Sequence, residues 1–118
     1  MATEQESTLS NLLDKFTSSK ILNEFSKNNK DKLIIIYFTA KWCKPCKTLY
    51  PFINEKIKQY TNSYFSIIDV DTDKYQELCD DFSIQAMPTI LFYKNSVEID
   101  KIVGVDKKKI EELIIEHK

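Results

Sequence analysis

The sequence has few of the residues that several common kinds of functional site require. All 17 basic residues are lysine, and glycine and histidine each occur once. A single glycine cannot supply the glycine-rich loop that cradles a nucleotide, so no bound cofactor is expected. The single histidine, His117, is the penultimate residue, which leaves a cysteine hydrolase without a well-placed base. No run of 18 apolar residues occurs, so no membrane association is expected.

Charge is balanced along the chain, which argues against nucleic-acid binding. The 17 basic side chains are interleaved with 18 acidic ones, for a net charge of −1. A nucleic-acid site needs basic charge gathered on one face. The one tight run, Lys107-Lys108-Lys109, begins a helical pattern and is expected to face solvent. A length of 118 residues with 42% hydrophobic residues predicts one domain with a core of its own.

The first residues differ in composition from the rest. Residues 1–7 are acidic and lack both the apolar core of a secretory signal and the arginines of a transit peptide. We expect a flexible lead over residues 1–8 and a single domain over 9–118. Three cysteines, an odd number, do not suggest a secreted disulfide framework, so a location in the reducing cytoplasm is expected. A monomer is also expected.

Two cysteines spaced C-x-x-C directly follow the apolar run that begins at Leu33. If Cys43 opens the following helix, its sulfur faces unpaired N–H groups and the positive end of the helix dipole, which favour a thiolate. Cys46 lies one turn further in and is more buried. Pro45 suits a first-turn position, where its missing N–H costs nothing. This arrangement predicts an attacking Cys43 and a resolving Cys46.

Hydrophobic periodicity predicts strands and helices in alternation. The central strand, 32–39, is continuous and rich in β-branched residues, as expected for a strand buried on both faces. Pro51 is expected to kink the helix after the cysteines. Ile21 and Leu22 are expected to face inward from the first helix. The predicted strands are 12–16, 32–39, 64–70, 89–93 and 97–103, and the predicted helices are 18–29, 43–60, 73–81 and one capped by Asp106.

The segment Trp42-Cys43-Lys44-Pro45-Cys46-Lys47 resembles the thioredoxin active-site motif, with Lys44 where glycine is usual. The resemblance runs from about residue 20 to the C-terminus. It implies the α/β thioredoxin fold, a central mixed β-sheet flanked by helices. It also implies a protein disulfide reductase and electron carrier that acts on disulfide-containing proteins and is regenerated by a thioredoxin reductase. Further residues in the expected order are Phe38, Ala40, Pro51, Asp69-Val70-Asp71, Met87-Pro88-Thr89, Phe92 and Gly104.

The resemblance also implies roles for residues around the pair. The Met87–Pro88 peptide is expected to be cis and to lie against the disulfide, with the Met87 backbone binding an extended substrate. Tyr37 occupies a place where most thioredoxins carry a buried aspartate, and together with Lys44 it is expected to modulate the chemistry. The expected substrate-binding residues are Trp42, Pro45, Ala86, Met87, Pro88 and Gly104.

Other interpretations remain open at this stage. The cysteine pair could be half of a zinc site, for which only Cys79 and His117 remain as further ligands. Cys79 suits a small buried hydrophobe or a regulatory thiol. Trp42 could belong to the core. The domain could be a binding module, which would keep its effect without Cys43 and Cys46, or a tryparedoxin-like variant with a different reduction potential.

Overall fold

The computed structural model describes residues 12–60 and 62–118, so the expected lead over 1–8 lies outside the described residues. Strands and helices follow one another in the predicted order, and the strand near 12–16 is shorter than expected. The strands are β1 (Leu12–Leu13), β2 (Ile34–Thr39), β3 (Tyr64–Asp69), β4 (Thr89–Lys94) and β5 (Val97–Val103). The helices are α2 (Ser19–Lys27), α3 (Lys44–Tyr60), the 3₁₀ turn η1 (Asp73–Tyr75), α4 (Gln76–Asp81) and α5 (Lys107–His117).

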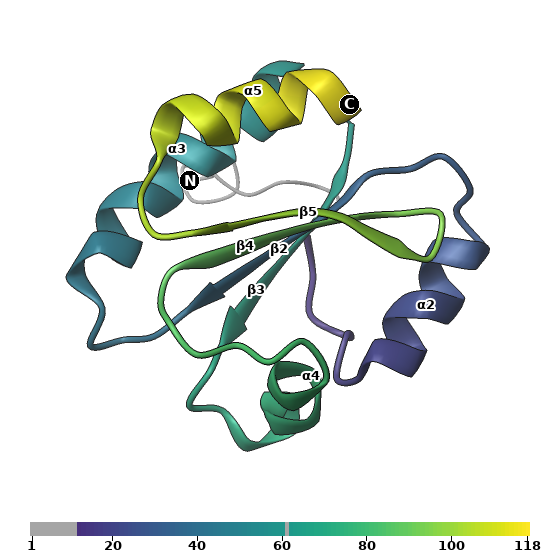
Figure 1. The fold of residues 1–118 in the computed structure, drawn as a ribbon, viewed down its shortest axis with the longest axis horizontal. Helices are drawn as coiled ribbons and strands as arrows, with labels where there is room; N and C mark the ends of the chain where they lie inside the picture. The colour runs from purple at the N-terminus through teal and green to yellow at the C-terminus, as the bar shows by residue number, and fades with distance from the viewer. Residues whose placement is uncertain (1–11, 61) are drawn as a thin grey trace, which may run out of the picture.

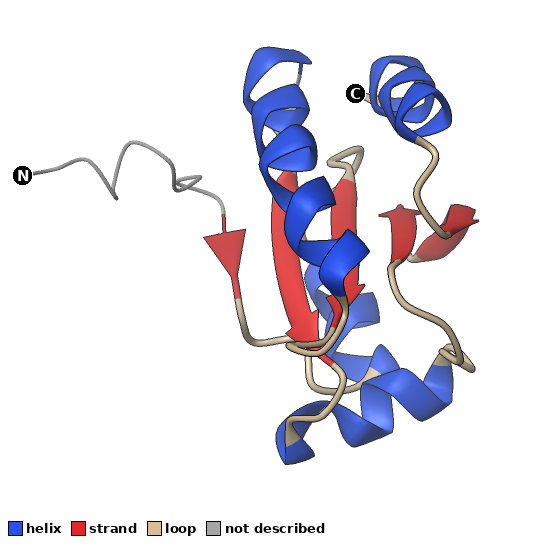
Figure 2. Cartoon of the chain, turned by 90° about the vertical axis from the view of Figure 1, so that its left-hand side faces the viewer, coloured by secondary structure: helices blue, strands red, loops and turns tan. Residues whose placement is uncertain are grey.

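The five strands form one mixed sheet in the order β1-β3-β2-β4-β5. β3 runs parallel to β1 and β2, whereas β4 runs antiparallel to β2 and β5. β1 is the short strand at one edge of the sheet (Figure 2). β2 lies in the middle, so the loop that carries the two cysteines leaves from the centre of the sheet.

Helices cover both faces of the sheet. α3 and α5 lie together on one face, and α2 and α4 lie on the other (Figure 1). Successive side chains of a strand point to opposite faces, so β2 contributes to two cores. Ile35 and Tyr37 belong to the core under α3 and α5, and Ile36 and Phe38 to the core under α2 and α4. The prediction of a central strand buried on both faces is confirmed.

The prediction that Ile21 faces inward is wrong, because its side chain is 37% exposed. α2 is short and buries a single stripe through Leu22 and Ser26, which are four residues apart and therefore lie on one face. Ile21 is rotated by about 100° from Leu22, which turns it toward solvent. The helix start is as predicted, since the Ser18 hydroxyl accepts the Ile21 N–H at 3.2 Å.

α3 runs from Lys44 to Tyr60 with Pro51 inside it. Its buried stripe of Cys46, Leu49, Ile53 and Ile57 packs on the sheet. This packing fixes the start of the helix against the end of β2, which is where the cysteine pair lies.

Candidate active site

Cys43 and Cys46 lie where the chain passes from β2 into α3. The Cys43 N–H donates to the Ala40 carbonyl at 3.1 Å, which closes the turn before the helix. The two cysteines form a disulfide, with their Cα atoms 5.4 Å apart. Both are buried, at 4% exposure for Cys43 and 1% for Cys46. The expected order of exposure is therefore present, although the difference is small.

The backbone at the start of α3 is aimed at the Cys43 sulfur. The Cys46 N–H points to Cys43 Sγ at 3.3 Å, and Cys43 directly precedes the first residue of the helix. The first N–H groups of a helix have no partner within the helix, and they carry the positive end of its dipole. In the reduced dithiol the same N–H would stabilise negative charge on Cys43.

Trp42 is exposed rather than part of the core. Its side chain is 68% exposed, and its indole N–H donates to Asp71 Oδ2 at 2.8 Å. Pro45, which follows in the first turn of α3, is also exposed. The interpretation of Trp42 as a core residue is therefore wrong. Asp71 was not identified from the sequence as its partner, since nothing in a local pattern joins residues 29 positions apart.

A loop from the other side of the sheet completes the surroundings of the pair. The Met87–Pro88 peptide is cis, as predicted. Met87 is half-buried and packs against the core cluster that contains both cysteines, while Ala86 is exposed. The Thr89 hydroxyl donates to the Ala86 carbonyl at 2.6 Å, which holds the loop closed behind the cis peptide.

Gly104 is bonded to this loop, since its N–H donates to the Pro88 carbonyl at 2.8 Å. Its φ is +94°, a conformation that favours glycine. A Cβ built at this position would have no atom within 4 Å. Backbone conformation, and not crowding within the chain, therefore explains why glycine stands here.

Tyr37 lies beneath the pair and is 1% exposed. Burial raises its pKa to about 12, although a hydrogen bond with Thr39 acts in the opposite direction. The hydroxyl therefore stays protonated at neutral pH and cannot take the place of a carboxylate base. The hydroxyl donates a hydrogen bond to the Cys46 carbonyl oxygen. The hydroxyl thus holds the backbone of Cys46.

A groove of about 360 Å³ reaches Cys46 beside Tyr37. Thr39 and Tyr50 were not identified from the sequence as residues of the site. Thr39 lies two residues after Tyr37 in β2, and Tyr50 lies four residues after Cys46 in α3, so each shares a face with an expected site residue. No carboxylate is among the residues that line this groove. The lining residues are Tyr37, Thr39, Cys46, Lys47, Tyr50 and Ile67.

The remaining candidates lie away from the pair. Cys79 is a free, buried cysteine in α4, within the core on the other face of the sheet. Burial and the charge of Asp80 raise the pKa of its thiol. In the described ranges 12–60 and 62–118, no three His, Cys, Asp or Glu side chains come together to hold a metal ion. A zinc site built from the pair, Cys79 and His117 is therefore excluded for these residues.

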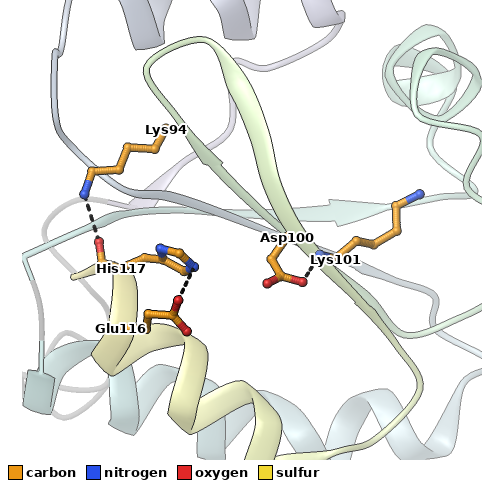
Figure 3. A network of polar contacts seen from close by, with 5 residues as sticks. All are labelled: Lys94, Asp100, Lys101, Glu116 and His117. Carbon is orange, nitrogen blue, oxygen red and sulfur yellow. Dashed lines mark hydrogen bonds and ion pairs between the residues drawn. The ribbon is translucent and has the colours of Figure 1, made fainter.

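His117 ends α5 and is not a freely solvated terminus, because its side chain is only 22% exposed. Lys94 Nζ donates to the His117 carbonyl oxygen at 3.2 Å, and His117 Nε2 lies 3.8 Å from a Glu116 carboxylate oxygen (Figure 3). The bond from Lys94 ties the end of α5 to β4. Among the helices of the described residues, none is long and apolar enough to span a membrane.

Comparison with known proteins agrees with this geometry. The thioredoxin family model matches residues 15–116. Thioredoxin H5 of Arabidopsis thaliana is 42% identical over 90 residues, which cover 76% of this chain and 75% of that protein. Thioredoxin of Mus musculus is 37% identical over 87 residues, which cover 74% of this chain and 81% of that protein.

Solved structures agree in the same way. The crystal structure of thioredoxin NaTrxh from Nicotiana alata superposes with a TM-score of 0.78 at 36% identity, covering 94% of this chain and 96% of that one. This chain combines the fold, the disulfide-bonded C-x-x-C pair and the cis-proline loop, and it is similar in sequence to these thioredoxins. The protein is therefore a thiol–disulfide oxidoreductase that belongs to the thioredoxin family.

Proposed function

We propose that Cys43 attacks disulfide bonds of other proteins and that Cys46 resolves the resulting adduct. The observation that carries this assignment is the Cys46 N–H aimed at Cys43 Sγ at the start of α3. It favours the thiolate at Cys43 over that at Cys46, whose side chain lies one turn inside the helix and is almost completely buried. A nucleophile has to meet its substrate, and Cys43 is the cysteine beside the exposed Trp42.

The exchange balances without a bound cofactor. The Cys43 thiolate attacks one sulfur of the substrate disulfide, the substrate S–S bond breaks, and the other substrate sulfur leaves as a thiolate that takes up a proton. Cys46 then loses its proton to solvent and attacks Cys43 Sγ, which releases the second substrate sulfur as a thiol. Two electrons and two protons pass from the dithiol to the substrate, and the Cys43–Cys46 disulfide remains.

We place the substrate across the rim of the pair. Trp42, Pro45 and Ala86 are exposed around it, and Met87 and Gly104 are partly exposed beside them. The backbone of Met87 would pair with an extended substrate segment, with Pro88 fixing the loop. Tyr37 would act on the resolving step by holding Cys46, and Lys44 would act on the thiolate of Cys43.

We place the return of electrons with a separate NADPH-dependent thioredoxin reductase. This role makes the protein an electron carrier between that enzyme and protein disulfides. A single chain is the active unit, because one chain supplies both the cysteine pair and the exposed residues around it. The unpaired Cys79 thiol supports a reducing, cytoplasmic location. We retain the domain boundaries 9–118, with residues 1–8 outside the domain.

Reduction of insulin disulfides by the full chain, recycled by dithiothreitol, tests the proposal. Wild type should reduce insulin and Cys43→Ser should not. Cys46→Ser should accumulate a mixed disulfide through Cys43, identified by mass spectrometry of non-reduced peptides. Recovery of the adduct from Cys43→Ser instead would reverse the two roles, and an inactive wild type would refute the proposed reaction.

A further inference from the structure

Three exposed lysines lie close to Cys43 in sequence, where α3 begins. Lys41 lies in the turn before Trp42, and Lys44 and Lys47 lie in the first turn of α3. Within residues 12–60 and 62–118, none of these three ammonium groups has an ion pair or a hydrogen bond. Further along α3, by contrast, Lys56 pairs with Glu111 at 3.5 Å. The positive charge of these ammonium groups is therefore available to interact with a bound substrate.

Two aspartates lie near the site and offset part of this positive charge. Asp71 Oδ2 accepts the indole N–H of Trp42 at 2.8 Å, and Asp69 Oδ1 accepts the Asp71 N–H at 2.9 Å. Asp69 ends β3 and Asp71 follows it in the loop that leads to η1. Accepting a hydrogen bond does not remove the charge of a carboxylate, so Asp71 offsets part of the positive charge beside Trp42. The three lysines still exceed these two aspartates by one charge.

The charges of the three lysines and the dipole of α3 act on the same region around Cys43. The first turn of α3 presents its positive dipole end at Cys43, and the three ammonium groups add charge of the same sign. A substrate disulfide has to come within bonding distance of Cys43 Sγ, so residues beside the attacked sulfur enter this positive field. Negative side chains there are attracted, and positive ones are repelled and delay the encounter.

We propose that Lys41, Lys44 and Lys47 select, among disulfide substrates, those with aspartate or glutamate beside the attacked cysteine. This selection rests on the proposed disulfide reduction and specifies its substrate class. It differs from the effect of Lys44 on the Cys43 thiolate, because thiolate stabilisation changes the rate toward every substrate by the same factor, whereas charge selection changes the ratio between substrates.

Two matched substrates test the proposal. Each consists of two short peptides joined by one disulfide, and the pair differ only in having glutamates or lysines beside the attacked cysteine. The full chain, reduced with dithiothreitol and then freed of it, is mixed with each substrate in a single turnover. Wild type should reduce the glutamate substrate faster by roughly tenfold at an ionic strength of about 0.01 M, and this ratio should fall toward one near 1 M salt.

A charge-reversed variant and a matched control complete the test. The triple variant Lys41→Glu, Lys44→Glu, Lys47→Glu should invert the ratio. Single variants such as Lys47→Glu should lower it in steps, which keeps the test decisive if the triple variant does not fold. The control, Lys20→Glu, Lys27→Glu, Lys30→Glu, makes the same change in net charge on exposed residues in and after α2, across the molecule from the start of α3 (Figure 1). It should keep the wild-type ratio.

The outcomes separate the two proposals. Equal rates for the two substrates, a ratio that does not respond to salt, or a triple variant with the wild-type ratio would overturn the charge selection while leaving disulfide reduction intact. If wild type reduces neither peptide nor the uncharged hydroxyethyl disulfide, the proposed function itself fails and the selection falls with it.

Discussion

Cys43 and Cys79 are both buried cysteines, at 4% and 8% exposure, but they occupy opposite environments. Cys43 directly precedes a helix, with an N–H aimed at its sulfur and Lys44 next in sequence. Cys79 lies inside the short helix α4, next to Asp80, among apolar side chains. Burial and the charge of Asp80 raise the pKa of the Cys79 thiol. Burial alone therefore does not decide reactivity, whereas the position of a cysteine relative to a helix start and the sign of the adjacent charge do.

The sheet also separates the two cysteines. Cys43 and Cys46 belong to the core under α3 and α5, and Cys79 belongs to the core under α2 and α4. In the folded protein the third cysteine is kept from the exchange chemistry of the pair.

The largest expected effect comes from removing each sulfur in turn. Cys43→Ser should abolish insulin reduction, because it removes the attacking thiolate. Cys79→Ser should leave the rate within about twofold of wild type and lower the free energy of unfolding by about 1–3 kcal/mol, because it places a hydroxyl in an apolar core. Loss of activity in Cys79→Ser, with its fold intact by circular dichroism, would break the comparison.

Tyr37→Asp sharpens the comparison by placing a charge beneath the active pair. The smaller residue leaves a cavity and the carboxylate is desolvated, so the free energy of unfolding should fall by about 3 kcal/mol or more. If the pocket tolerates it, the carboxylate should speed the attack of Cys46 on the mixed disulfide. Denaturant unfolding and single-turnover product release measure the two effects.

Tyr37→Asn is the matched control, since it has the size of aspartate without its charge. It should lose stability and gain no speed. A Tyr37→Asp protein that is more stable and slower than wild type would show that the tyrosine hydroxyl has a chemical role of its own.

Tyr37→Phe tests how the start of α3 is held. At neutral pH it should cost about 1–2 kcal/mol of unfolding free energy, because the Cys46 carbonyl loses a buried donor. The pKa of Tyr37 is raised from 10.0 to about 12. A raised pKa contributes stability that is complete below pH 10 and is lost as the pH rises toward 12.

Wild type should therefore lose roughly 2–3 kcal/mol more than Tyr37→Phe between these two pH values. Urea unfolding of both proteins across this range is the measurement. A gap between them that does not change with pH would show that the hydroxyl is not desolvated in the fold.

The smallest expected effect concerns the charge beside Cys43. A cation next to the sulfur favours the thiolate, and hence the reduced dithiol, but exposure to solvent screens it. Lys44→Gly should make the protein more reducing by less than about 30 mV, measured by equilibration with glutathione. A shift toward a more oxidising potential would contradict this reasoning. Lys108→Gly, in the first turn of α5, should leave the potential unchanged and serves as the control.

Much of the scaffold follows from local patterns. The apolar run through Ile34, Ile35 and Ile36 predicted a central strand because only a strand buried on both faces tolerates such continuity. Asp106 accepts the Lys109 N–H at 3.1 Å, as its capping position predicted. The turn between β4 and β5 has positive φ at Asn95 and Ser96, which fits a tight turn between the two predicted strands 89–93 and 97–103.

Expectations drawn from the sequence were less accurate where they depended on burial. Ile21 is exposed because α2 buries only one narrow stripe, and the sequence does not show how wide a stripe a short helix can cover. His117 is partly buried because the end of α5 lies against Lys94 of β4, which a chain-end position does not indicate.

By itself, the sequence determined the order of strands and helices, the central β2 strand and the spacing that lets Cys43 and Cys46 form a disulfide. These features depend on residues close together in the chain, so local geometry is enough. Only the tertiary structure decided that Tyr37 donates to the Cys46 carbonyl, that Asp71 binds the Trp42 indole, and that Cys79 lies across the sheet from the pair. Those contacts arise when the sheet and helices pack. Packing brings polar groups that lie on different elements within hydrogen-bonding distance, and it places a continuous sheet between the cysteine pair and Cys79.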